Sequence, residues 1–145
     1  MLDKIQKDYI DAFKAKEIVK KDVLGLLKGA ILNAQIDKKE DLTDEEIINL
    51  VEKQIKLRKD SKEEYLKANK MDVVETLDEE ISVLMEYMPE QLSIDEVNKI
   101  IDEAFDLVKP SSPRDMGLIM KEVTPKLKGK ADMKEVSNII KNKLS

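Results

Sequence analysis

The chain contains no cysteine and no histidine among its 145 residues. Without cysteine it has no disulfide, no thiolate nucleophile and no zinc–thiolate site. Without histidine it lacks the side chain that most often serves as a general base near neutral pH and as a metal ligand. A Ser-His-Asp triad and the Glu-x-x-His di-iron site of helical bundles are therefore excluded.

Strand-forming and turn-forming residues are also scarce. Aromatic residues make up 3% of the chain, there is no tryptophan, and glycine and proline number four each. A β-sandwich or barrel needs more aromatic and β-branched residues and many more turns. Hydrophobic residues reach 41% and charged residues 39%, which is typical of helices that have a buried face and a long solvated face. The composition predicts an all-α protein.

Long apolar runs are absent as well. No stretch approaches the roughly 20 apolar residues of a membrane-spanning helix. The first residues, Met1-Leu2-Asp3-Lys4, lack the basic and then apolar order of a signal peptide. We therefore expect a cytoplasmic protein with no membrane partner.

Apolar residues recur at helical spacing along the whole chain, and seven helices are predicted. Their approximate ranges are 2–15, 17–36, 44–69, 72–88, 93–108, 112–124 and 132–144. Capping patterns support four of the starts, at Thr43/Glu46, Ser93/Glu96, Ser112/Asp115 and Asp132/Glu135. Pro125 is expected to kink or end its helix near Thr124, and Gly129 to form a C-cap.

The segment after Pro89 is the best candidate for a domain boundary. The prediction is an N-terminal helical domain of about four helices, residues 1–90, followed by a three-helix bundle, residues 91–145. Gly25 and Gly29 lie one turn apart inside the second predicted helix. Because each disfavours a helix by about 1 kcal/mol relative to alanine, we expect them to allow close approach of a neighbouring helix.

Motifs that carry catalytic chemistry are missing. The dinucleotide and phosphate-binding glycine loops, the G-x-S-x-G and S-x-x-K nucleophile motifs and the EF-hand loop do not occur. Acidic runs such as 44–46 and 78–80 could bind Mg²⁺, but they are better explained as solvated helix faces or first-turn acids. No catalytic residue, metal site or cofactor is predicted.

Charge is distributed unevenly around the overall value of −5. Residues 40–106 contain eight Lys or Arg and twenty-one Asp or Glu, a net charge of −13, whereas residues 107–145 contain nine and four, a net charge of +5. Such asymmetry is more informative than the total, because a basic segment can bind a polyanion even in an acidic protein.

The basic tail provides the candidate site. Lysines surround Pro125 and Gly129, and the turn before the last helix could offer N–H and ammonium groups to phosphates. The candidate residues are Lys121, Lys126, Lys128, Gly129, Lys130 and Lys134. An ordinary turn between two helices with solvated lysines explains the same pattern, and no aromatic residue is interleaved for base stacking. Asp132 would also compete with a phosphate at the helix start.

A second basic run, Lys56, Arg58, Lys59 and Lys62, lies in the third predicted helix. It alternates with Asp60, Glu63 and Glu64, so pairing along the same helix is the simpler interpretation.

Several segments together resemble the GatB/YqeY family. They are the blocks 26–34 and 57–61, Glu86-Tyr87-Met88-Pro89-Glu90-Gln91-Leu92-Ser93, Asp115-Met116-Gly117, and Leu127-Lys128-Gly129-Lys130-Ala131-Asp132. The resemblance covers nearly the whole chain in the same order. The residue after Asp132 is often glycine in that family and is Met133 here, where it fits an apolar helix stripe.

The family is similar to the C-terminal tail of GatB, a component of glutamyl/aspartyl-tRNA amidotransferase. The resemblance implies an all-helical protein whose tail holds tRNA. The resemblance also implies a carbon–nitrogen ligase activity with glutamine as amide donor. The sequence contains no nucleophile–base pair and no phosphate-binding loop for such an activity.

Three hypotheses stay open at this point. The first is a non-catalytic tRNA-binding accessory module that uses the tail lysines. The second is a helical protein-interaction module, with an amidotransferase or synthetase as partner, whose acidic middle segment meets a basic surface. The third is a free-standing amide ligase, which measurable glutaminase activity would support.

Overall fold

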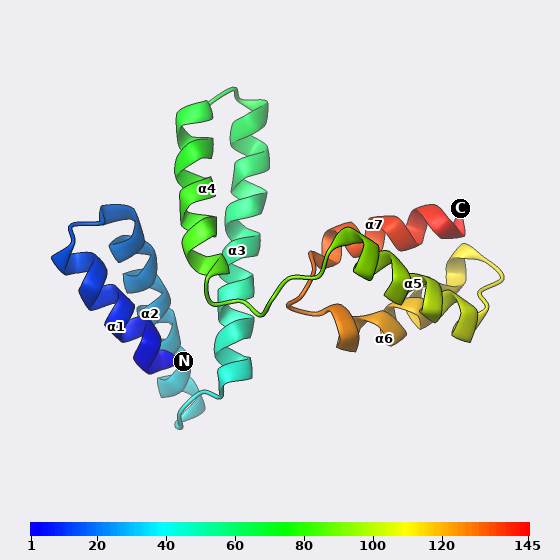
Figure 1. Cartoon of the computed structure of the whole chain (residues 1–145), viewed down its shortest axis with the longest axis horizontal. Helices are drawn as coiled ribbons and strands as arrows, with labels where there is room; N and C mark the ends of the chain where they lie inside the picture. Colours follow the sequence, from blue (N-terminus) through cyan, green and yellow to red (C-terminus); the bar gives the residue numbers. More distant parts are fainter. The chain divides into compact units, whose positions relative to one another are not determined.

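A computed structural model describes residues 1–145 and contains seven α-helices and one short 3-10 helix, without β-strands (Figure 1). The all-α prediction is confirmed. The helices are α1 (Leu2–Lys14), α2 (Ile18–Lys38), α3 (Asp44–Lys67), α4 (Met71–Met85), α5 (Ile94–Val108), α6 (Met116–Leu127) and α7 (Met133–Leu144). None of the seven helices contains the long apolar stretch that a membrane span requires.

The chain forms two compact units, Met1–Met88 and Pro89–Ser145. In the first, α3 and α4 form a hairpin, α1 packs along α2, and α2 packs against the hairpin (Figure 1). Its core includes Ile5 from α1, Leu27 from α2 and Leu84 from α4. In the second unit, α6 packs against both α5 and α7, and its core includes Ile101, Val123 and Ile140.

Helix starts follow the sequence signals closely at three positions. Thr43 and Glu46 form a complete capping box at the start of α3. The Ser93 side chain accepts the backbone N–H of Glu96, so Ser93 caps α5. Asp132 accepts the backbone N–H of Lys134 at 3.0 Å and caps α7. These side chains satisfy donors that the first turn of a helix leaves without partners.

The predicted helix start at Ser112 is confirmed in position, with Pro113 at the first helical residue, but the side chain of Ser112 does not act as the cap. Its side chain makes no capping hydrogen bond, and residues Pro113–Asp115 form the 3-10 helix ahead of α6. The Asp115 carboxylate instead accepts hydrogen bonds from the backbone N–H of Ser111 at 2.8 Å and from its hydroxyl. The Ser111 N–H holds the pKa of Asp115 below its usual value, so this loop is organised by an aspartate that faces backward along the chain.

Two helix ends also differ from prediction. The helix predicted to reach residue 88 ends at Met85, and the following N–H groups bond three residues back, a tighter turn that brings Tyr87 into the core. α6 continues through Pro125 to Leu127. Proline removes only one backbone donor there, and burial of Leu127 keeps the final turn helical.

Basic residues of α3 pair across the hairpin. The Nε atom of Arg58 lies 3.4 Å from an oxygen of Glu80, and Lys62 Nζ lies 2.7 Å from Asp78, with both acids on α4. For these two residues the prediction of pairing along the same helix is wrong. These ion pairs therefore join the second half of α3 to α4.

Candidate nucleic-acid interface

The turn between α6 and α7 contains the centre of the predicted basic site. Gly129 has φ 79°, a left-handed conformation that disfavours side chains with a Cβ, and it directly follows the C-cap residue Lys128. The N–H groups of Lys130 and Ala131 both bond to the carbonyl of Leu127, at 2.9 and 3.0 Å. Gly129 therefore ends α6 sharply and allows the chain to reverse into α7.

Hydrogen bonds from Gln91 and Leu92, just after Pro89, hold this turn in place. The Gln91 amide Nε2 donates to the carbonyl of Gly129 at 2.9 Å and to that of Pro89 at 2.8 Å. The backbone N–H of Leu92 donates to the carbonyl of Lys130 at 2.9 Å. Sequence reasoning missed Gln91, because its role depends on a contact 38 residues away.

Backbone donors of the turn are already used inside the chain. The N–H groups of Lys128, Lys130 and Ala131 bond to carbonyls of α6, and that of Lys134 bonds to the Asp132 carboxylate. A helix start that offers free N–H groups to a phosphate is thus not formed by these four residues. Any anion bound here would contact ammonium groups instead.

The lysine side chains of the turn remain available. Lys126, Lys128 and Lys130 are exposed, and none of them forms an ion pair within the chain. Gly129, which lies between the last two, is buried and contributes its conformation to the turn. Three cations are therefore presented within five residues by a backbone that hydrogen bonds hold in place.

The other two predicted residues lie away from this group. Lys121 is exposed and has no ion pair, but it precedes Lys126 by five residues on α6. Five residues turn a helix by about 140°, so Lys121 and Lys126 do not share a face. Lys134 is exposed in the first turn of α7 and interacts within the chain.

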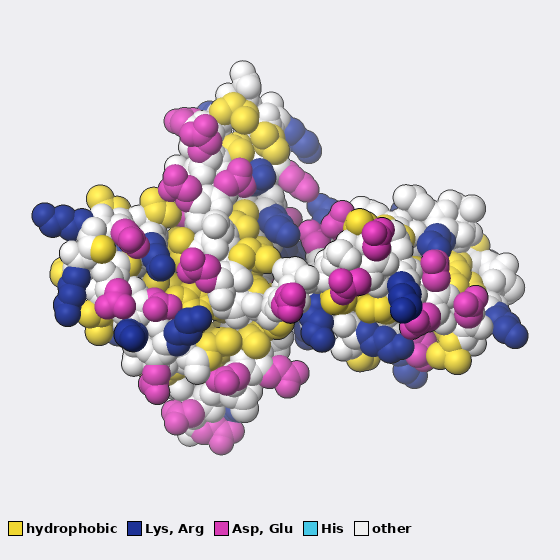
Figure 2. Space-filling model, viewed as in Figure 1, with side chains coloured by type: hydrophobic (Ala, Val, Ile, Leu, Met, Phe, Trp, Pro, Cys, Tyr) yellow, Lys and Arg dark blue, Asp and Glu magenta, His cyan; other side chains and the backbone are white.

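Charge within the C-terminal unit is balanced in total and distributed unevenly along the chain. Residues 89–145 contain ten Lys or Arg and ten Asp or Glu, so the unit is neutral. Helix α5 has five acids and one lysine, whereas residues 116–145 have seven lysines and three acids. Figure 2 shows side chains of both signs on the visible face of this unit. The exposed acids give α5 a surface of the opposite sign to the turn.

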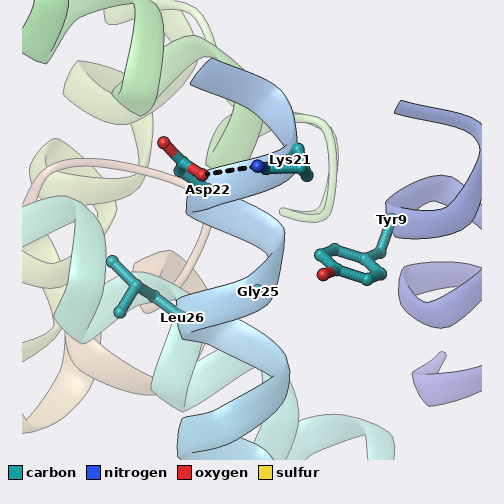
Figure 3. Close-up of a pocket in the computed structure, with 5 residues that line it drawn as sticks. All are labelled: Tyr9, Lys21, Asp22, Gly25 and Leu26. Atoms are coloured by element: carbon teal, nitrogen blue, oxygen red, sulfur yellow. Dashed lines mark ion pairs between the residues drawn. The ribbon is translucent and has the colours of Figure 1, made fainter. Parts of the chain in front are cut away.

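Catalytic arrangements are not evident elsewhere. No group of three or more Asp or Glu side chains could hold a metal ion. A notch of about 500 Å³ in the N-terminal unit is lined by Tyr9, Lys21, Asp22, Gly25 and Leu26 (Figure 3). Its two charged groups, Lys21 and Asp22, lie 3.5 Å apart and pair with each other. The notch thus offers no nucleophile with an adjacent base.

Comparison with known proteins places this helical architecture in a family. The chain belongs to the family of Yqey-like proteins, which matches residues 2–144. It is 34% identical over 131 residues to "Altered inheritance of mitochondria protein 41, mitochondrial" of Lachancea thermotolerans, covering 88% of this chain and 68% of that protein. The protein of the same name from Pyrenophora tritici-repentis is 28% identical over 133 residues, or 90% of this chain and 73% of that protein. An uncharacterized protein of Schizosaccharomyces pombe is 32% identical over 92 residues, covering 61% of this chain and 72% of that protein.

Proposed function

We propose that this Yqey-like protein is a non-catalytic accessory module that binds tRNA through the turn between α6 and α7. The observation that carries the proposal is the group of three exposed lysines without ion pairs, Lys126, Lys128 and Lys130, on a turn that hydrogen bonds hold in place. Because the backbone of the turn is already fixed, only the lysine side chains would lose conformational freedom on binding, which favours contact with a rigid polyanion.

The chemistry of the turn favours phosphate contacts over base recognition. Lysine is a flexible point charge with three donors and binds phosphate without the planar geometry that reads a base edge. No aromatic side chain lies in residues 116–145 to stack on a base. Recognition would therefore depend on the shape and backbone of folded RNA.

The uneven distribution of charge in the C-terminal unit would orient a bound RNA. An RNA approaching α5 would meet its exposed acids, whereas one approaching the turn would meet lysines. This uneven distribution would favour one orientation of the RNA, because the acids of α5 would repel its phosphates.

Fluorescence anisotropy with purified total tRNA at several salt concentrations tests the proposal. Replacing Lys126, Lys128 and Lys130 by glutamate should abolish binding at low salt while circular dichroism stays helical. Separate Lys→Ala changes should each reduce the slope of log K against log salt by about 0.7 to 0.9, the value for one phosphate contact. The matched control replaces Lys53, Lys56 and Lys70, which are exposed on or beside α3 and α4, by glutamate.

Equal loss in the control would mean that net charge matters and the turn does not. Absence of binding by the intact protein at low salt would overturn the proposal, and the second candidate would replace it. That candidate is a protein-interaction module in which the exposed acids of α5 meet a basic partner surface such as that of an amidotransferase or synthetase. The observation in its favour is that five acids lie on α5 and only Asp102 among them pairs with a lysine, Lys143.

A carbon–nitrogen ligase activity has no supporting geometry in this chain. A glutaminase assay on the purified protein, with glutamate release as readout, should give no signal above background.

A further inference from the structure

Helix α2 has apolar side chains on two sides, and the N-terminal unit covers only one of them. Leu24, Leu27 and Ile31 lie on the covered side and are at most 1% exposed. On the other side Ile18, Leu26 and Ile36 are 67%, 63% and 72% exposed. Large apolar side chains that are exposed together on one side of a helix can form a contact surface for a partner. The second side, called here the free face of α2, therefore has the composition of a contact surface.

Gly29 creates a depression at the centre of this face. It lies 11 residues after Ile18 and seven before Ile36, so at 100° per residue all three point in nearly the same direction. No heavy atom lies within 4 Å of the position that a Cβ of Gly29 would occupy. By contrast, Gly25 is in contact with Tyr9 of α1, whose ring would lie 3.3 Å from its Cβ (Figure 3). The close approach predicted for the two glycines occurs at Gly25 within the chain and is unused at Gly29.

The exposed side chain of Leu26 could fill the same depression on a second α2 helix. Figure 3 shows its side chain on the side of α2 away from the Tyr9 ring. Leu26 and Gly29 are three residues apart and so occupy adjacent places on the same face. A second α2 helix in the opposite direction would set its Leu26 over this Gly29 while presenting its own Gly29 to this Leu26.

We propose that the free face of α2 binds the same face of a second copy of this chain, as an antiparallel pair with two-fold symmetry. In such an interface each contact occurs twice with the roles exchanged. The register that sets Leu26 against the partner's Gly29 also sets Asp22 against the partner's Asn33. It brings Ile18 to the level of the partner's Ile36.

Two polar side chains that lie within the face, between Leu26 and the line joining Ile18 and Ile36, select this arrangement. Asp22 and Asn33 are both exposed, and an amide N–H can donate to a carboxylate. A parallel pair would set Asp22 against the partner's Asp22 and leave the two Gly29 depressions facing each other. The antiparallel pair replaces repulsion by a hydrogen bond and fills both depressions.

The area of the face fits a weak, specific dimer. The face consists of three exposed apolar side chains, Gly29 and the two polar groups between them, so a symmetric pair would lie near the lower limit of about 1,000 Å² for a specific interface. Association should therefore depend on concentration in the micromolar range and above.

Sedimentation equilibrium of the full chain from about 5 to 500 μM tests the proposal, since mass action governs a weak pair. The mass should rise toward twice that of one chain as concentration increases. Gly29→Leu fills the depression and should abolish the rise, and because leucine favours a helix more than glycine does, this variant should fold well. The combined Leu26→Gly and Gly29→Leu variant exchanges projection and depression and should restore association. Leu57→Lys, which changes a leucine 53% exposed on α3, is the control and should associate normally.

Direction can be tested separately because the chain has no natural cysteine. An equal mixture of Ile18→Cys and Ile36→Cys chains should form mixed disulfide dimers under mild oxidation, and neither variant alone should do so efficiently. A monomer at every concentration would overturn the proposal, and so would preferential linkage of Ile18→Cys chains to each other. A monomer that binds anionic phospholipid vesicles through Leu26 and Ile36 would also overturn it and assign the face to a membrane surface.

Discussion

The hydroxyl of Tyr87 donates a hydrogen bond to Asp8 at 2.5 Å and so joins the turn after α4 to helix α1, 79 residues earlier in the chain. Tyr87 is buried in the core of the N-terminal unit. Lys4 of α1 lies over its ring, 5.5 Å from the centroid. This contact closes the N-terminal unit by connecting its first helix to its last turn.

Loss of the hydroxyl should therefore weaken the N-terminal unit. Tyr87→Phe keeps the ring and removes one hydrogen bond to a charged acceptor, so unfolding free energy should fall by about 1.5 to 3 kcal/mol. Urea denaturation followed by circular dichroism measures the change. Combining Tyr87→Phe with Asp8→Ala gives a double-mutant cycle, and additive losses would show that the two side chains are not coupled.

Stability at high pH should depend on the same tyrosine. Burial, followed by the hydrogen bond to Asp8, raises the pKa of Tyr87 well above its usual value. The unfolded chain therefore loses this proton first, so the stabilisation is complete below about pH 10 and declines as pH rises further. Absorbance titration of tyrosinate should show one group that ionises only at very high pH or on unfolding. The Tyr87→Phe variant should lack that component.

The start of α3 should respond to acid. Glu46 accepts from Lys38 Nζ at 2.6 Å and from the N–H of Thr43 at 3.1 Å. The Lys38 hydrogen bond, followed by the Thr43 N–H, lowers the pKa of Glu46. Its stabilisation is thus present above the usual pKa of a glutamate and is lost as pH falls through the lowered pKa of Glu46. Glu46→Gln should flatten this part of the stability–pH curve, as thermal unfolding at each pH would show.

Thr43→Ala tests the same helix start without changing a charge. Removing the hydroxyl that accepts from the Glu46 N–H should lower stability by about 1 kcal/mol, the usual effect of losing an N-cap. Thr76→Ala is the control, because its hydroxyl only bonds back to Asp72 in the interior of α4. Equal effects of the two changes would argue against a special role for the cap.

Two helices have as their C-cap residue a lysine in the left-handed conformation that glycine adopts most easily. Lys39 after α2 has φ 63° and Lys109 after α5 has φ 52°. Glycine should stabilise each site by up to about 1 kcal/mol, because it avoids the left-handed penalty of a residue with a Cβ. Lys53→Gly inside α3 is the opposite control and should destabilise by about 1 kcal/mol. Chemical denaturation would distinguish the signs.

The turn between α6 and α7 should lose its order when Gln91 is shortened. Gln91→Ala removes the donor to the Gly129 carbonyl and leaves the three lysines unchanged. Helicity should persist, whereas amide hydrogen exchange at residues 128–131 should accelerate and tRNA affinity should fall several-fold. Gly129→Ala imposes a left-handed alanine and should destabilise by about 1 to 2 kcal/mol. Unchanged exchange in Gln91→Ala would show that the turn is ordered without this contact.

Local sequence patterns determined the helices of this protein. Apolar spacing located all seven, because a period near 3.6 residues is a property of the chain itself. The caps at Thr43, Ser93 and Asp132 could also be predicted from the sequence, since each side chain bonds to a backbone group two or three residues away. The basic character of the tail and the absence of cysteine and histidine chemistry also came from the sequence.

Only the tertiary structure decided which of these residues meet. Arg58 pairs with Glu80 across the hairpin, and Gln91 holds the turn at Gly129, although nothing near them in sequence indicates it. The structure also distinguished the two glycines of α2. The ring of Tyr9 packs against Gly25, whereas no heavy atom lies within 4 Å of the position that a Cβ of Gly29 would occupy. The physical reason is range: a helix and its caps are set by contacts within four residues, whereas the site and the free face of α2 depend on contacts between segments far apart in the chain.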